Sequence, residues 1–230
     1  MRLARSPVGR IAITALALVV WFWTQSLIGA RPLPATGLGD EMFVVTAELN
    51  QFLRDHAAAA NALLVASSAI VDGLGLLLIG AWIAGASPRP FAGLVLVLAL
   101  RQLMQALVAL PAPPDMIWHH PGFPSLFVTY GVANDYYFSG HTAIATLGAL
   151  ELARARRAWI TVLAVALVVF EASAVIILRA HYTMDVFTGL VTALYVSDVT
   201  GRIWPDAGRA GAPARRHGRR QDRVRPGMRR

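Results

Sequence analysis

The stretch AAAANALLVASSAIVDGLGLLLIGAWIA, residues 57–84, contains a single charged side chain, Asp72. A helix needs about 20 mostly apolar residues to cross the hydrocarbon core of a bilayer, and this run exceeds that length. The stretch therefore predicts a membrane-spanning helix. Working outward from it, apolar runs bounded by polar or proline-rich segments predict six spans in all, at residues 11–30, 56–84, 91–110, 138–152, 159–178 and 182–204.

The composition of the whole chain agrees with this interpretation. Of 230 residues, 56% are hydrophobic and 15% are charged, whereas soluble domains carry about 25% charge. We expect an all-α polytopic membrane protein in which residues 1–206 form one bundle of six helices. The chain has no cysteine, which excludes a disulfide, a thiol nucleophile and a thiolate metal site.

The basic residues predict the orientation. Arginines precede the first predicted span, occur at Arg89 and at residues 154–157, and crowd the segment 207–230. These positions alternate onto one side of a six-span protein, so the positive-inside rule places both termini in the cytoplasm. The 20-residue apolar run near the N-terminus is longer than the core of a signal peptide, and we expect it to remain as a helix. Residues 207–230 are expected to be a disordered basic tail on anionic lipid rather than a nucleic-acid contact.

Two short motifs carry histidines to the opposite side: NDYYFSGHT, residues 134–142, and RAHYTMDVF, residues 179–187. His181 and Asp185 are four residues apart, so on a helix they share one face. We expect the carboxylate to accept a hydrogen bond from one imidazole nitrogen and thereby leave the other nitrogen as a nucleophile or base. A solvated histidine at a helix end is the alternative for either histidine alone.

The first motif also predicts an anion site at a helix N-terminus. Ser139 or Asn134 is expected to cap the helix that begins near His141, and the free N–H groups of its first turn favour an anion. Gly140 lets the backbone approach that anion closely. We expect Asp135 and Tyr136 to contact the substrate or to orient His141. The alternative is that they are simply polar residues of a loop.

Two further arginines are candidate phosphate ligands. Arg101 lies deep in the third predicted span, where an unpaired charge is costly. It is expected to clamp a phosphate, or to form an ion pair with Asp72 or Glu171. Arg179 is a second clamp candidate, with extension of its side chain to the interface as the alternative. The adjacent His119 and His120 suggest no metal site, and no metal or cofactor is expected.

The motifs DYYFSGHT and HYTMD, together with RQLMQALVALPAPP at residues 101–114, resemble the signature blocks of the sphingomyelin synthase and phosphatidylcholine:diacylglycerol cholinephosphotransferase family. This family is a branch of the phosphatidic-acid phosphatase type 2 superfamily. The resemblance implies that His181 is the nucleophile, that Asp185 orients it and that His141 protonates the leaving group. The superfamily's usual proline before the SGH block is Phe138 here, and its usual phosphate-binding arginine blocks are absent, which favours the transferase branch.

The residues and the resemblance together predict a membrane enzyme that moves a phospho-head-group from a phospholipid to a lipid alcohol such as diacylglycerol or ceramide. The alternatives are a lipid phosphatase or phospholipase C-type hydrolase with water as acceptor, and a membrane scaffold or transporter without enzymatic activity. The expected setting is a bacterial inner membrane, with the histidines on the periplasmic or exoplasmic side. Assembly into a homo-oligomer is left open.

Overall fold

The computed structural model describes residues 6–30, 38–85, 87–132 and 135–205, and all regular structure within these ranges is α-helical. The eight helices are α1 (Pro7–Gly29), α2 (Glu41–Val45), α3 (Ala47–Asp55), α4 (Ala57–Ile83), α5 (Arg89–Leu107), α6 (Gly140–Ala153), α7 (Ala158–Ile177) and α8 (Thr183–Ile203). The six helices predicted from the apolar runs are present, and each end lies within four residues of its predicted position. The predicted tail at residues 207–230 lies outside the described residues.

Four helices, α1, α4, α5 and α7, are long and apolar enough to cross a membrane. The helix α6 has 14 residues, which is short for a span. The helix α8 has 21 residues but includes Asp185, Asp198 and Arg202, and it is not among the four. The protein is therefore an all-helical membrane protein, while six spans remain a prediction.

The short helices α2 and α3 were not predicted, and they lie between the first two predicted spans. Asp40 caps α2 by accepting a hydrogen bond from the Met42 amide. Asn50 of α3 is buried and donates to the carbonyl of Ile177 at the end of α7. Helices of five and nine residues are marginal alone, so tertiary contacts of this kind stabilise them, and the sequence pattern is too short to show them.

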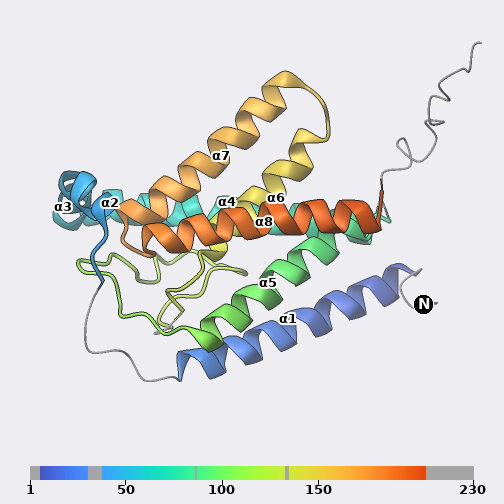
Figure 1. The fold of residues 1–230 in the computed structure, drawn as a ribbon, viewed down its shortest axis with the longest axis horizontal. Coiled ribbons are helices and arrows are strands. Elements are labelled where there is room, and N and C mark those ends of the chain that lie inside the picture. The colour runs from blue at the N-terminus through green and yellow to red at the C-terminus, as the bar shows by residue number, and fades with distance from the viewer. Residues whose placement is uncertain (1–5, 31–37, 86, 133–134, 206–230) are drawn as a thin grey trace, which may run out of the picture.

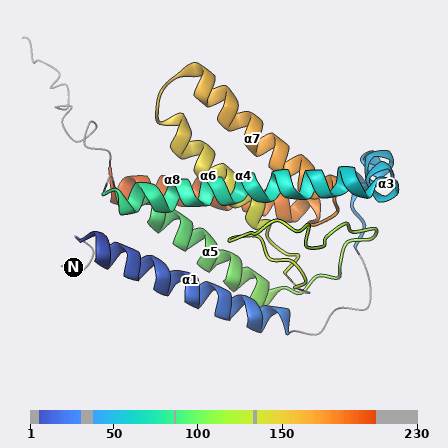
Figure 2. The same ribbon diagram turned by 180° about the vertical axis from the view of Figure 1, so that it is seen from behind.

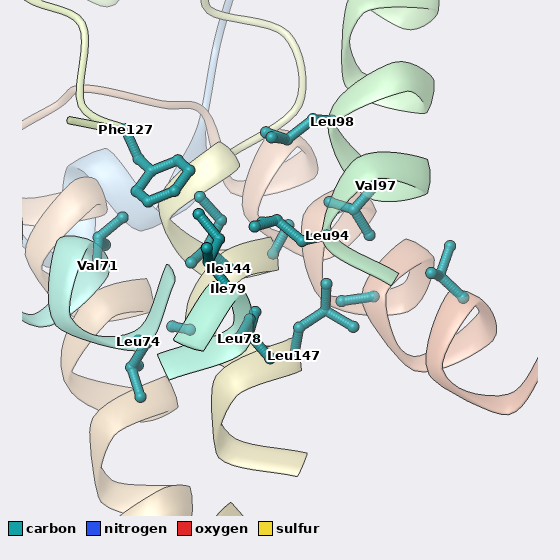
Figure 3. Close-up of a cluster of buried hydrophobic side chains, with 14 of the residues drawn as sticks. Val71, Leu74, Leu78, Ile79, Leu94, Val97, Leu98, Phe127, Ile144 and Leu147 are labelled. Carbon is teal, nitrogen blue, oxygen red and sulfur yellow. The ribbon is translucent and has the colours of Figure 1, made fainter. Parts of the chain in front are cut away.

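The helix α6 is the centre of the bundle and packs against α4, α5, α7 and α8. Its residues 141–149 are all buried, as expected for a helix that is surrounded by other helices. Gly148 permits a close approach to α4, because a Cβ there would lie 2.8 Å from Cβ of Leu74. Figure 3 shows the cluster around Leu78, Leu94, Ile144 and Leu147 that fills the space between these helices.

The two ends of the bundle differ in chemistry. The start of α1, the α4–α5 connection and the end of α8 lie at one end of the bundle, and the α6–α7 connection projects from the same half of the molecule (Figures 1 and 2). The helices α2 and α3 and the described residues 108–132 and 135–139 lie toward the other end. The first of these ends carries Arg10, whose guanidinium binds the carbonyls of Trp82 and Ile83, and Arg89, which pairs with Glu151. Both histidine motifs belong to the other end.

Candidate active site

The N-terminus of α6 carries the first histidine. Ser139 is the N-cap residue, and its hydroxyl accepts a hydrogen bond from the Thr142 amide. The Ser139 amide in turn donates to the carbonyl of Asp185, at 3.0 Å, which joins the start of α6 to the start of α8. This junction places His141 in the first turn of α6, facing the turn that carries His181. The alternative cap, Asn134, lies outside the described residues.

A tight turn after α7 positions the second histidine. The amide of Arg179 donates to the carbonyl of Ile176, and the amide of Ala180 donates to that of Val175. This is the Schellman arrangement, in which the residue after the helix is left-handed and usually glycine. Here that residue is Arg179, with φ of 56°. The turn reverses the chain and directs His181 inward.

His181 is oriented by a backbone carbonyl. Its Nδ1 lies 2.7 Å from the carbonyl oxygen of Tyr136, which can only accept, so Nδ1 donates and Nε2 keeps its lone pair. The nearest approach of Nδ1 to the Asp185 carboxylate is 4.0 Å, longer than a hydrogen bond. Asp185 instead accepts from the Tyr182 amide and forms a capping box at the start of α8. Burial lowers the pKa of His181 to about 4, which favours the neutral imidazole.

Both imidazoles line one small cavity, which we call the histidine cavity. The ring centroids of His141 and His181 are 6.5 Å apart, and Nε2 of His141 is buried without a partner among the described residues. The cavity volume is about 20 Å³, room for roughly one water molecule. Arg101, Asp135, Tyr136 and Gly140 also line this cavity.

The buried guanidinium of Arg101 is held by residues from two other segments. It forms an ion pair with Asp135, at 3.1 Å, and donates to Oε1 of Gln25 at 2.7 Å. Its Nε has no partner within the described structure. Gly140 packs on this side chain, since a Cβ there would lie 3.1 Å from Nε. Arg101 therefore reaches the histidine cavity with its Nε–H unused, and its ion-pair partner is Asp135.

The two carboxylates that the sequence suggested as ion-pair partners of Arg101, Asp72 and Glu171, have other hydrogen-bond partners. Asp72 accepts hydrogen bonds from the amides of Leu126 and Phe127, and Glu171 accepts from the hydroxyl of Ser67. Asp72 thus anchors the segment that connects α5 to α6, and neither carboxylate pairs with Arg101.

Arg179 is directed away from the histidine cavity. Its guanidinium donates to the carbonyl of Phe43 in α2 and lies over the ring of the same residue, 4.6 Å from the centroid. Of the two candidate arginines, Arg101 lines the cavity, whereas Arg179 contacts α2 and does not line it. Within the described ranges, no group of three His, Asp or Glu side chains is arranged to hold a metal.

Gln25 is the site residue that the sequence did not suggest. It lies in α1, is buried, and contacts Arg101, Gln102 and Asp135 through hydrogen bonds. Gln25 lies between Thr24 and Ser26 in an otherwise apolar run, which is a weak signal, although a buried amide in a membrane helix normally has a polar partner. The helix α1 therefore supplies part of the polar network around the site.

The fold and the cavity define a helical membrane protein with two buried histidines beside a buried arginine. The chain belongs to the AtPDCT1/2 family, whose model matches residues 39–202, and this confirms the resemblance that the motifs indicated. It is 23% identical over 180 residues to phosphatidylcholine:diacylglycerol cholinephosphotransferase 1 of Arabidopsis thaliana. That match covers 78% of this chain and 57% of the relative. No solved structure matches the chain.

Proposed function

We propose that the protein is a lipid head-group phosphotransferase that moves a phospho-head-group, such as phosphocholine, from a glycerophospholipid to the hydroxyl of a second lipid. The observation that carries the proposal is the pair of imidazoles on one buried cavity, with Nδ1 of His181 bound to a carbonyl and its Nε2 free. The relationship to a protein named as a cholinephosphotransferase supports the same reaction class.

In the first half-reaction, Nε2 of His181 attacks the phosphorus of the phosphodiester. A P–N bond forms and the bond between phosphorus and the diacylglycerol oxygen breaks. His141, protonated while the phosphodiester anion is bound, gives its proton to the leaving oxygen. Asp185 acts through the backbone, because it caps α8 beside His181 and its carbonyl holds the N-cap of α6.

In the second half-reaction, the hydroxyl of the acceptor lipid attacks the same phosphorus. His141 now accepts the hydroxyl proton, the P–N bond breaks, and the lone pair returns to Nε2 of His181. The free Nε–H of Arg101 and those first-turn amides of α6 that precede Thr142 offset the charge on the equatorial oxygens. Ser139 and Gly140 shape that helix end, and Asp135 and Tyr136 position Arg101 and His181.

Hydrolysis is a second candidate, because a cavity of about 20 Å³ has room for a water molecule beside the histidines. Water in place of the lipid acceptor would give a phospholipase C-type reaction, or a phosphatase with a phosphomonoester substrate. A scaffold or transporter would give no turnover.

The experiment supplies purified protein with labelled phosphatidylcholine and fluorescent diacylglycerol or ceramide. Transfer predicts a new labelled phospholipid, whereas hydrolysis predicts free head-group phosphate with or without the acceptor. His181→Ala is expected to abolish head-group release and His141→Ala to lower it by at least about 10²-fold. His119→Ala is the matched control, since His119 is exposed and bonded to Asn61 outside the cavity. Full activity in His181→Ala would end the assignment of the nucleophile.

We further propose that α6 and α8 also span the bilayer and that the histidine end lies on the exoplasmic side, in a bacterium the periplasmic side. The grouping of the arginine-bearing connections at the opposite end supports this orientation (Figure 1). The basic segment 207–230 is proposed to bind anionic lipid. Labelling of single cysteines added at each end of this cysteine-free chain tests the orientation.

A further inference from the structure

An apolar groove lies between α1 and α5, beside the histidine cavity. Its volume is about 400 Å³, and its walls include Leu18 and Val20 of α1 and Phe91, Leu94 and Val95 of α5. Val20 is 49% exposed and Val95 is 38% exposed, so the rims of the groove face outward. We call this feature the α1–α5 groove.

The length of the groove matches one leaflet of a bilayer. It follows α1 from Thr14 to Thr24, which is about 15 Å at 1.5 Å per residue. The hydrocarbon core of a bilayer is about 30 Å thick, so half of it has the same depth. On α5 the groove extends from Phe91 to Gln102, over a similar distance. A lipid tail that enters at the histidine end of the bundle would fill it.

The groove and the histidine cavity share a wall. Trp21, Leu98 and Phe127 line both spaces. The indole N–H of Trp21 is buried without a partner in the described structure, as is Oε1 of Gln102. Buried polar atoms without partners are costly, and these two lie where the groove approaches the polar site. They suit a ligand that has an apolar tail and a polar group at the junction.

The shared wall is built from a fixed side and a loosely packed side. Asp72 binds the amide of Phe127, and Gly75 leaves room for its ring, since a Cβ at Gly75 would lie 2.3 Å from Cε2 of Phe127. Trp21, in contrast, belongs to α1. In the most apolar stretch of α1, 17% of the residues are buried, compared with 44% in the corresponding stretch of α4. The helix α1 is therefore the side of the wall that can move with the least loss of packing.

We propose that the α1–α5 groove binds one acyl chain of the phospholipid whose phosphodiester reacts in the histidine cavity, and that the lipid enters between α1 and α5. The proposal rests on the proposed function for the identity of the head-group site. A cavity of about 20 Å³ does not hold a phosphodiester, so entry requires Trp21 to move away from Phe127. The ring centroids of these two residues are 5.9 Å apart.

The test fills the groove with one side chain. Ala99 lines the groove and is exposed, so Ala99→Trp adds bulk there without entering the core. The matched control is Ala166→Trp, an exposed alanine on α7 that does not line the groove. With short-chain and long-chain phosphatidylcholine in competition, Ala99→Trp is expected to lower the preference for the long chain about tenfold, about 1.4 kcal/mol. Ala166→Trp should leave the preference unchanged.

A second measurement does not depend on turnover. Phosphatidylcholine with a photoreactive group in one acyl chain is bound to the protein in detergent and activated by light. Labelling of α1 and α5 that unlabelled phosphatidylcholine displaces is expected in the native sequence and in Ala166→Trp, and is lost in Ala99→Trp. If the native protein shows this labelling but no head-group transfer, acyl-chain binding in the groove is supported and the proposed function is overturned. Transfer with unchanged chain preference and unchanged labelling in Ala99→Trp would overturn the groove alone.

Discussion

Gly189 is the residue at which one added methyl group acts most directly on the separation of the two histidines. A Cβ at this position would lie 2.4 Å from the carbonyl oxygen of Ser139, and the contact atom is backbone rather than a flexible side chain. Ordinary contact distances require α8 and the start of α6 to separate by about 1 Å. Because the Ser139 amide bonds the Asp185 carbonyl across the same junction, the separation also strains that hydrogen bond.

The Gly189→Ala variant is therefore expected to lose about 1–3 kcal/mol of stability from overpacking. Displacement of reacting groups by about 1 Å is expected to lower head-group release by about 10²-fold. The measurements are thermal unfolding in detergent, followed by tryptophan fluorescence, and the transfer assay with labelled phosphatidylcholine.

The control is Gly201→Ala in the same helix. An added Cβ at Gly201 meets nothing within 4 Å, so this variant should be unchanged or more stable by about 0.5–1 kcal/mol, with normal transfer. If Gly189→Ala unfolds at the wild-type temperature and transfers head groups at the wild-type rate, the close approach of α6 and α8 does not hold the histidines in place.

Three further predictions concern the residues around the histidine cavity. Arg179→Gly should be more stable than Arg179→Ala by about 1 kcal/mol, because glycine accepts the left-handed turn; an alanine variant as stable as the glycine variant would contradict strain at this turn. Asp135→Asn leaves Arg101 without its buried counter-charge and should lower the free energy of unfolding by about 3–5 kcal/mol; equal stability of the variant and the native protein would contradict the ion pair. His181, whose pKa burial lowers to about 4, should stay neutral near pH 6.5, where an exposed histidine titrates. The free energy of unfolding should decrease as pH falls from about 6.5 toward 4, because the unfolded chain binds the proton first; a free energy of unfolding that His181→Ala does not make less dependent on pH in this range would contradict this.

The bundle and the two histidine motifs could be predicted from the sequence, because both signals are local. An apolar run longer than a bilayer core can be recognised without knowing its neighbours, and the six predicted helices are present. The sequence also indicated that SGH and HYTMD lie at helix starts on the same side. The short helices α2 and α3 have no comparable local signal, because contacts such as the bond from Asn50 to the Ile177 carbonyl stabilise them.

The sequence by itself determined the class of the protein, its family and the residues that converge at one end of the bundle. The tertiary structure decided which groups contact one another. It paired Arg101 with Asp135 and Gln25, and it directed Arg179 to Phe43. His181 donates a hydrogen bond to the carbonyl of Tyr136, whereas Asp185 lies too far away to accept one. The physical reason is that hydrogen-bond partners depend on the path of the loop between α5 and α6 and on how closely the helices approach, and neither is encoded in the spacing of a motif.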